Sequence, residues 1–348
     1  MLVIRAVQTA DLDALIEMAR QAGSGMTTLK PDRKMLGDRV ATAVASFNET
    51  IPPEQRDYMF VLEHAAQSAE PGSIAGVCAI KGAVGLTEPF YNYRIGTLVH
   101  CSRELNVFTR METLYLSNDL TGSSELCSLF LLPEYRAGFN GKWLSKSRFL
   151  FIAQFQQLFT EKIIAEMRGY QDENGVSPFY EGLGRHFFKM DFDHVDGLTA
   201  IGKKSFIAEL MPRQPLYVDY LPESAREVIG KVHTSTQPAR KLLENEGMHY
   251  EGYVDIFDAG PVLQGRVSEL RAVRDSVLAV AGEGVEEGET EHLLVSNTRL
   301  ADFRMILTRG VPGAARIALS AQELSQLHVQ SGDEVRTLSL NTRKNAHA

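Results

Sequence analysis

The stretch LFLLPEYRAGFNGKWLSKSRF, residues 129–149, changes character near its midpoint. It begins with apolar residues typical of a buried strand, passes through a turn and continues as a helix. The turn contains Arg136, Gly138 and Gly141 in the order R-x-G-x-x-G. Phosphate binding at a strand-to-helix junction needs free backbone N–H groups, glycines that let the anion approach, and the positive end of a helix dipole. The stretch therefore predicts an anion-binding turn.

Positive charge continues along the helix that follows this turn. No acidic residue occurs between Arg136 and Arg148, although the whole chain has 44 acidic and 36 basic residues. The additional cations of the helix are Lys142, Lys146 and Arg148. A run of like charge on a helix is also typical of a solvated surface. The charge pattern alone leaves both interpretations open.

Length and composition exclude several classes of protein. With 348 residues, of which 44% are hydrophobic, the chain is long enough to bury a full core and is expected to form about two domains. Its formal net charge of −8 is dispersed along the chain, which argues against nucleic acid as a partner. No apolar run approaches the roughly 18 residues that a membrane span needs. We therefore expect a cytoplasmic protein with no membrane partner.

The cysteines and histidines give no sign of a metal site. Cys78, Cys101 and Cys127 are far apart and odd in number, which fits neither a disulfide framework nor a C-x-x-C site. The histidines show neither H-x-x-H nor H-E-x-x-H spacing. We expect reduced thiols and no bound metal.

The first half of the chain predicts a mixed sheet flanked by helices. Apolar residues recur at helical spacing over residues 12–22 and 33–47, and a long helix begins near Gly141. Patterns typical of strands occur at residues 2–7, 58–64, 73–85, 93–102, 113–118, 125–132 and 162–169. A hairpin connection is expected at residues 65–72. This order of elements predicts an α+β fold.

Two later segments share a plan. Residues 177–192 and 237–256 each contain a proline near a helix start, an amphipathic helix, a glycine and aromatic residues that lead into a strand. The similarity suggests a duplicated half-unit, although proline starts and glycine stops are common in helices generally. Beyond Arg274 five short strand patterns flank an acidic loop, which predicts a small β-rich C-terminal region without a catalytic role.

The segment from the strand through P-E-Y-R-x-G-x-x-G to the helix resembles the acyl-CoA signature of the GCN5-related N-acetyltransferase superfamily. In that superfamily the glycine turn holds the CoA pyrophosphate, and the preceding strand is splayed so that its backbone pairs with the pantetheine arm. The matching strand here is residues 126–132. Superfamily members more often have Q/R-x-x-G-x-G/A at the turn. Tyr180 lies in a segment similar to the closing helix, where a tyrosine often protonates the leaving thiolate; packing is its alternative role.

Longer blocks resemble one family more closely. NDLTGSSELC (residues 118–127), YVDIFDAGP (residues 253–261) and other blocks up to about residue 275 look like the arginine N-succinyltransferase family, which includes arginine/ornithine succinyltransferase subunits. The resemblance implies transfer of the succinyl group of succinyl-CoA to the α-amino group of L-arginine or L-ornithine. Succinyl-CoA is then a co-substrate, with no permanently bound cofactor. The reaction would open an ammonia-producing route of arginine degradation.

The resemblance also implies a division of the chain into three parts. Residues 1–195 are expected to form an acyl-CoA-binding N-acyltransferase-like domain. Residues 196–275 are expected to form a second acyltransferase-like half that contributes to the active site. Residues 276–348 would form the small β-rich C-terminal region.

The proton donor of the family maps to His233, within GKVHTSTQPAR (residues 230–240). Aminolysis of a thioester needs an uncharged amine, a donor for the oxyanion and a proton for the leaving thiolate, but no covalent nucleophile. His233 lies between apolar residues and a Ser/Thr-rich turn, where an imidazole can titrate near neutral pH. The alternative is a histidine that caps a helix C-terminus.

The remaining candidates concern the two substrates. The succinyl-CoA contact of the family maps to Leu129, on a proposed pantetheine strand that also contains Leu131. The phosphates are assigned to Arg136, Gly138, Gly141 and Lys142. Candidates for binding the succinyl carboxylate are Arg94, Ser123 and Ser124. Candidates for binding a guanidinium are Asp119, Glu125, Asp255 and Asp258.

Two other hypotheses remain open. In the first, the chain is a non-catalytic CoA-binding partner in a pair of similar subunits. In the second, it is an N-acyltransferase of the same fold with another acyl or amine substrate. Retention of His233 and of the R-x-G-x-x-G turn argues against the non-catalytic hypothesis. The sequence does not decide between a homo-oligomer and pairing with a paralogous subunit.

Overall fold

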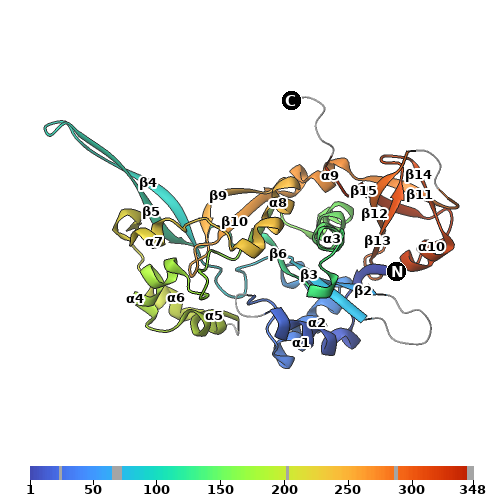
Figure 1. Ribbon diagram of the computed structural model, residues 1–348, viewed down its shortest axis with the longest axis horizontal. Helices are drawn as coiled ribbons and strands as arrows, with labels where there is room; N and C mark the ends of the chain where they lie inside the picture. The colour runs from blue at the N-terminus through green and yellow to red at the C-terminus, as the bar shows by residue number, and fades with distance from the viewer. Residues whose placement is uncertain (23–25, 65–72, 201–203, 286–288, 343–348) are drawn as a thin grey trace.

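A computed structural model describes residues 1–22, 26–64, 73–200, 204–285 and 289–342. One mixed sheet of 15 strands runs through this part of the chain, in the order β14-β11-β15-β12-β13-β1-β2-β3-β6-β7-β10-β9-β4-β5-β8. The molecule is correspondingly elongated, with the β4–β5 hairpin at one end and the C-terminal strands at the other (Figure 1). Among these residues, no helix combines the length and apolar character that a membrane crossing requires.

The N-terminal half supplies the centre of the sheet. Its elements are β1 (Leu2–Ala6), α1 (Leu12–Ala22), α2 (Arg33–Phe47), β2 (Asp57–His64), β3 (Ser73–Lys81), β4 (Asn92–Ser102), β5 (Val107–Ser117), β6 (Ser124–Leu131), α3 (Asn140–Gln154) and β7 (Lys162–Glu166). The mixed α and β character predicted from the sequence is confirmed. The expected connection at residues 65–72 lies outside the described residues, although β2 and β3 do pair antiparallel.

The second half contributes shorter elements. They are α4 (Arg185–Phe188), α5 (Phe192–Ala200), α6 (Ser205–Leu210), β8 (Leu216–Tyr217), α7 (Glu223–Arg226), α8 (Gln237–Asn245), β9 (His249–Val254), β10 (Pro261–Arg266) and α9 (Arg271–Asp275). The C-terminal region contains β11 (Val277–Glu283), β12 (Glu291–Asn297), β13 (Arg304–Gly310), β14 (Arg316–Leu319), α10 (Ala321–Leu327) and β15 (Glu334–Ser339). This region is β-rich, as the sequence predicted.

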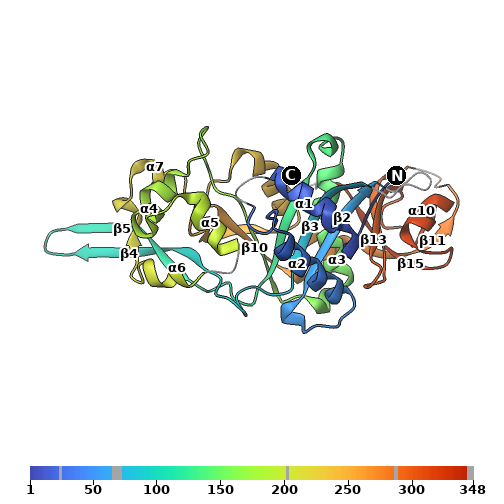
Figure 2. The ribbon, with the colours of Figure 1, turned by 90° about the horizontal axis from the view of Figure 1, so that it is seen from below.

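Helices cover both faces of the central strands. Successive residues of a strand point to opposite faces, so Met59 and Val61 of β2 pack with α1 and α2, whereas Tyr58 and Phe60 pack with α3. The views in Figures 1 and 2 place α1 and α2 together on one side of the sheet. The core is therefore divided by the sheet into two apolar layers.

Helix α3 is buried on all sides, which the sequence did not predict. Every residue from Trp143 to Ala153 is buried, because α3 lies between the sheet and helices α8 and α9. Lys146 forms a buried ion pair with Glu246, and Arg271 donates to the same carboxylate oxygen at 3.0 Å. The positive run on α3 is thus not a solvated surface, and Lys146 does not contribute to an anion site.

Strands β6 and β7 run parallel but pair only briefly. Their register includes Ser124 with Ile163 and Glu125 with Ile164, and no later pair. The other edge of β6 pairs with β3 through a bulge, and Ser128 has a positive φ of 55° at this point. From Leu126 onward, the edge of β6 that faces β7 therefore carries backbone groups without a strand partner.

The β4–β5 hairpin is longer than the sequence predicted. Strand β5 begins at Val107, six residues before the expected start at Thr113, and pairs with β4 out to Ser102. The extra residues are exposed, so they lack the alternation of apolar and polar side chains by which a half-buried strand is recognised. The hairpin consequently extends as an arm from the body of the molecule (Figures 1 and 2).

The prediction of a strand directly after residues 177–192 is wrong. Helix α5 begins at Phe192, and Val195 packs in the apolar core one helical turn later. By contrast, residues 237–245 form α8 and lead into β9 as predicted. The two segments therefore differ where the shared plan required a strand. The boundary expected at residues 195 and 196 lies inside α5.

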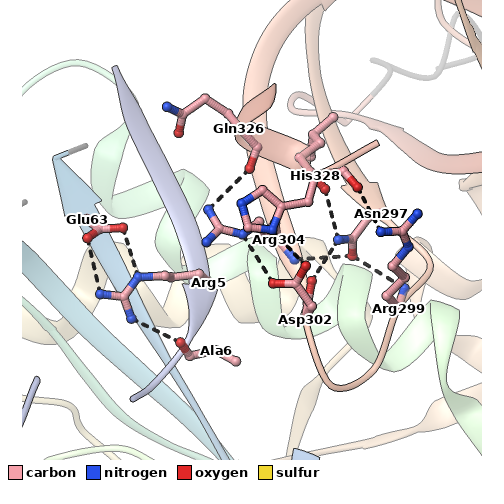
Figure 3. A network of polar contacts seen from close by, with 10 residues as sticks. Arg5, Ala6, Glu63, Asn297, Arg299, Asp302, Arg304, Gln326 and His328 are labelled. Atoms are coloured by element: carbon pink, nitrogen blue, oxygen red, sulfur yellow. Dashed lines mark hydrogen bonds and ion pairs between the residues drawn. The ribbon is translucent and has the colours of Figure 1, made fainter. Parts of the chain in front are cut away.

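The C-terminal region joins the sheet through β13, which pairs with β1. Arg5 and Arg304 are direct partners in this register, and like charges in such positions repel. Each has its own carboxylate: Arg5 donates to Glu63 at 2.8 Å, and Arg304 to Asp302 at 3.3 Å (Figure 3). The junction is thereby neutralised locally.

The buried ion pairs of α3 predict a large loss of stability in Glu246→Gln. The side chain of Glu246 has no exposed surface, and its loss leaves Lys146 and Arg271 as buried cations without a counter-charge. Breaking one partner of a buried pair costs about 3–5 kcal/mol. Urea unfolding should show this loss, whereas Glu251→Gln, which removes only an exposed partner of His249, should change stability by less than about 0.5 kcal/mol. Equal effects of both variants would contradict the stabilising role of the α3 pairs.

Candidate active site

Two connected cavities lie beside the diverging ends of β6 and β7. The larger has a volume of about 740 Å³ and the smaller about 450 Å³. Both are lined by the same six residues, Thr27, Thr28, Glu125, Glu166, Asp196 and Asp255. A substrate in each cavity would therefore meet the other at these shared residues.

The smaller cavity opens where β6 and β7 separate. It is lined by five consecutive residues of β6, Leu126–Phe130, and by residues 165–168 at the end of β7. Arg136 and Arg148 also line it, as do Ser235 and Thr236 from the segment before α8. One edge of the cavity is thus a strand that, among the described residues, has no paired strand on that side beyond Glu125.

Carboxylates concentrate where the two cavities meet. Glu125 and Glu166 come from the paired ends of β6 and β7, and Asp255 and Asp258 come from the turn between β9 and β10. We call these four residues the acidic cluster. Glu125 has Lys81 at 3.3 Å, and Glu166 accepts a hydrogen bond from the Asn92 amide at 2.7 Å. Among the described residues, these carboxylates do not assemble into a group that could hold a metal ion.

Burial makes the acidic cluster costly to ionise. It raises the pKa of Glu166 well above its ordinary value, and the neighbouring charges of Asp255 and Glu125 raise it further. Burial and Asp255 likewise raise the pKa of Asp258. Burial also raises the pKa of the nearby Asp196 to about 6. A cationic group placed among these carboxylates would relieve the repulsion and favour their ionised form.

The turn between β9 and β10 is fixed by its own aspartates. Asp255 accepts backbone hydrogen bonds from Phe257 and Asp258, at 2.7 and 2.9 Å. Asp258 accepts from Gly169 at 2.7 Å, which ties the turn to the end of β7. A Cβ at Gly260 would lie 1.9 Å from the carbonyl oxygen of Met167, so the close approach of these backbones requires glycine.

His233 does not itself line the smaller cavity, but Ser235 and Thr236, two and three residues later, do. Its backbone N–H donates to the Arg168 carbonyl at 2.8 Å, so the residue is attached to the end of β7. Its Nδ1 accepts from the Ser235 backbone N–H at 3.2 Å and lies 2.6 Å from the Ser235 hydroxyl. His233 therefore begins a short helical turn, rather than capping a helix C-terminus. Burial and the charge of Arg168 lower its pKa, which keeps the imidazole uncharged at neutral pH.

The glycine turn before α3 has the geometry expected of an anion site. Gly138 has a positive φ of 59°, with open space around it. The backbone N–H groups of Gly141 and Lys142 lie in the first turn of α3, and neither donates to another backbone group among the described residues. Arg136 lines the smaller cavity and donates to the Leu131 carbonyl at 2.9 Å. The side chain of Lys142 instead donates to Asn341 at 2.5 Å.

Several predicted site residues lie elsewhere. Arg94 and Asp119 form an exposed pair at 3.5 Å near the base of the β4–β5 hairpin. The Ser124 hydroxyl donates to the Gly82 carbonyl, and its neighbour Ser123 is buried in the preceding turn. Neither cavity is lined by these four residues, so the structure does not support the assignment of Arg94, Ser123 and Ser124 to the succinyl carboxylate or of Asp119 to the guanidinium.

Two of the predicted residues, Leu131 and Tyr180, have packing roles. Leu131 is buried against α3 and lines neither cavity, whereas Leu129 lines the smaller one. Tyr180 is fully buried, and its hydroxyl donates to the Met190 carbonyl at 2.8 Å. This agrees with the packing alternative for Tyr180.

The sequence did not identify Glu166, Arg168 or Arg148 as site residues. Glu166 and Arg168 immediately follow the apolar residues of β7, and charged residues at the end of a buried strand are a usable signal. Arg148 was recognised only as part of a charged run. Its burial depends on packing between α3 and distant segments, which the local sequence does not encode.

The comparisons with known proteins agree over the full chain. Residues 2–272 match the sequence model of a family described as arginine N-succinyltransferase beta subunit. The chain belongs to the arginine N-succinyltransferase family. Residues 276–339 match a second model, described as the C-terminal domain of the same subunit. Proteins called arginine N-succinyltransferase from Shigella sonnei and Escherichia coli are each 47% identical over 341 residues, covering 98% of both chains.

A solved structure extends this similarity to the fold of the family. It is the arginine/ornithine succinyltransferase subunit AI from Pseudomonas aeruginosa, with 34% sequence identity and a TM-score of 0.88. The similarity covers 98% of this chain and 99% of that one. The sheet, the helices and the C-terminal region are therefore features of an arginine N-succinyltransferase family structure.

The acidic cluster predicts a stability that falls as the pH rises. Because the pKa of Glu166 is raised in the folded chain, its contribution to stability is present below its ordinary pKa and is lost as the pH rises through the raised value. Glu166→Gln cannot ionise but keeps an acceptor for Asn92. It should therefore be more stable than the unchanged chain at pH 8, by about 1.4 kcal/mol for each unit by which the pKa is raised.

Thermal unfolding between pH 5 and pH 8 measures this difference, which should shrink toward the acidic end. The control is Glu161→Gln, which removes an exposed partner of Arg266 and should show no such trend. A Glu166→Gln variant that is less stable than the unchanged chain at pH 8 would refute the electrostatic cost assigned to the cluster.

Proposed function

We propose that this chain transfers the succinyl group of succinyl-CoA to the α-amino group of L-arginine, giving N2-succinyl-L-arginine and CoA. The observation that carries the proposal is the pair of connected cavities, one along an unpaired strand edge and one lined by carboxylates. The names of the related proteins agree with this reaction. The reaction is the first step of an ammonia-producing degradation of arginine.

The acyl donor occupies the smaller cavity. Its pantetheine arm pairs with the free edge of β6 near Leu129, as an additional strand would. Its pyrophosphate lies at the glycine turn, where Gly138, Gly141 and the first turn of α3 offer N–H groups. The brief pairing of β6 with β7 supports an N-acyltransferase-like fold for this part of the chain.

The acceptor occupies the larger cavity. A guanidinium is a planar cation that binds carboxylates through paired hydrogen bonds. The acidic cluster supplies these carboxylates, with Glu125 and Asp255 among the residues predicted from the sequence and Glu166 added by the structure. L-ornithine also carries a side-chain cation, so the same cluster admits it more weakly through a single ammonium group.

His233 moves the proton. The α-amino group has an ordinary pKa of about 8, so it must lose a proton before or during attack on the thioester carbonyl. The amine forms the C–N bond, the tetrahedral intermediate collapses, and the C–S bond breaks. An uncharged His233 accepts the proton from the nitrogen and returns it to the CoA thiolate. The lowered pKa of His233 suits the first of these steps.

The proposed three-part division groups the site residues, although its first boundary, at residues 195 and 196, lies inside α5. Residues 1–195 carry the donor strand and the glycine turn, and residues 196–275 carry His233 and the aspartate turn. The described residues of the C-terminal part, 276–285 and 289–342, complete the sheet beyond β1 and line neither cavity. A duplicated origin of the first two parts rests on a similar sequence plan, of which only residues 237–256 form the expected helix and strand. A cytoplasmic location follows from the supply of both substrates.

The exposed tip of the β4–β5 hairpin suggests self-association. Leu105 and Phe108 are 75% and 71% exposed, and Val99 and Val107 lie beside them on the same arm. Apolar side chains on a projecting arm are typical of a contact with another protein. We assign the contact to a second copy of this chain. Light scattering should show an oligomer that Phe108→Asp dissociates, and a monomeric unchanged chain would exclude the assignment.

The assay that tests the function is thiol release by the purified chain alone. Succinyl-CoA or acetyl-CoA is offered with L-arginine, with L-ornithine and without amine. Release that requires both succinyl-CoA and L-arginine is the expected result. Binding of succinyl-CoA without any release would instead support the non-catalytic partner hypothesis, and release with acetyl-CoA alone would point to another acyl donor.

Replacing His233 should remove most of the turnover. His233→Ala is expected to lower kcat by about 10²–10⁴, because that is the usual contribution of a positioned acid-base group. The KM for each substrate should change little, since the side chain is assigned to proton transfer and not to binding. His249→Ala is the matched control, because His249 is exposed and pairs with Glu251. If both variants keep the original rate, His233 has no part in the chemistry.

A further inference from the structure

Arg148 is a buried cation without a counter-charge. Its side chain leaves α3 toward the sheet, and the residue is only 2% exposed. Its guanidinium donates to Ser145 alone, through Nε to the carbonyl at 3.2 Å and through Nη2 to the hydroxyl at 3.1 Å. It forms no ion pair with any residue in the described ranges.

The surroundings of Arg148 do not compensate its charge. Apart from burial, the groups that act on its pKa are the thiols of Cys78 and Cys127. Burial raises the pKa of Cys78 to about 11 and that of Cys127 above its ordinary value, so both thiols are protonated at neutral pH. A buried charge without a partner costs several kcal/mol. An anion from outside the chain would complete the pair and remove this cost.

The position of Arg148 is suited to such an anion. The residue lines the smaller cavity, whose walls are β6 from Leu126 to Phe130 and the end of β7. It is the one lining residue of that cavity from the body of α3, so it reaches the space between the diverging strands from behind the sheet. Cys127, one of the two cysteines near Arg148, lies two residues from Leu129 along β6.

The other two arginines of this cavity also have only neutral hydrogen-bond partners, but they are less buried than Arg148. Arg136 donates to the Leu131 carbonyl and lies 5.5 Å above the Phe130 ring, toward the glycine turn. Arg168 donates to the Gln171 side chain, and its backbone holds His233. They are therefore assigned to the phosphate end and to the proton-transfer end of the cavity, respectively.

We propose that Arg148 binds the distal carboxylate of the acyl group and makes the enzyme selective for a dicarboxylic acyl-CoA. This inference rests on the proposed function and assigns a residue to its acyl specificity. A carboxylate that receives two N–H donors of a guanidinium forms the strongest type of ion pair in proteins. An acyl group with a methyl end would leave Arg148 buried and unpaired, and sites built for a polar group reject analogues that lack it.

The test compares succinyl-CoA with butyryl-CoA, which has the same four-carbon acyl chain and a methyl in place of the carboxylate. The unchanged chain should prefer succinyl-CoA strongly in kcat/KM with L-arginine. Arg148→Gln should lower the ratio of the two kcat/KM values by about 100-fold or more. Arg148→Lys, which keeps a cation without the paired donors, should keep an intermediate ratio.

Stability separates this role from a structural one. Removing an uncompensated buried charge should leave the melting temperature of Arg148→Gln unchanged or raise it. A variant that melts lower and loses activity equally with both acyl-CoA substrates would overturn the inference. An unchanged ratio in Arg148→Gln would also overturn it. Failure of the unchanged chain to use succinyl-CoA would instead overturn the proposed function, and this inference with it.

Discussion

The brief parallel pairing of β6 and β7 is the constraint on which the rest of the site depends. Because the strands separate after Glu125 and Ile164, the backbone of β6 keeps an unsatisfied edge. Unpaired backbone groups in a protein interior are costly unless water or a ligand satisfies them. The same divergence creates the smaller cavity, which Arg148 of α3 also lines. It also leaves Glu166, at the end of β7, close enough to Glu125 of β6 for the charge of Glu125 to raise its pKa.

Charge of both signs lines this gap, because the larger cavity contains Arg39, Arg56, Lys81 and Lys204 beside its carboxylates. Arg136 and Arg148 line the cavity that contains the free strand edge, and the carboxylates gather where the second cavity begins. The rest of the buried charge is neutralised internally, as the α3 network of Lys146, Glu246 and Arg271 shows. Arg148, which forms no ion pair among the described residues, contrasts with these paired structural charges.

Local sequence predicted the elements better than their surroundings. The helix expected at residues 33–47 has those bounds, because apolar spacing and the Asp32 cap are local signals. The long β5 was missed, since its exposed residues carry no alternation. The glycine turn was predicted from a pattern of fewer than ten residues, and Leu129 from the family resemblance. The role of Lys146 was left open by the sequence, because its partner Glu246 is 100 residues away in the chain.

The pairing of β1 with β13 has a consequence for synthesis of the chain. Ile4 is paired on one side with Leu62 and on the other with Met305. One edge of β1 therefore stays unpaired until residues about 300 positions further along the chain have been synthesised. At ordinary elongation rates this interval is roughly 15–60 s. During that time β1 presents an open, apolar strand edge to other nascent chains, and contacts of such high sequence separation form slowly. Assembly of this sheet is therefore completed after translation and depends on protection of its N-terminal strand until then.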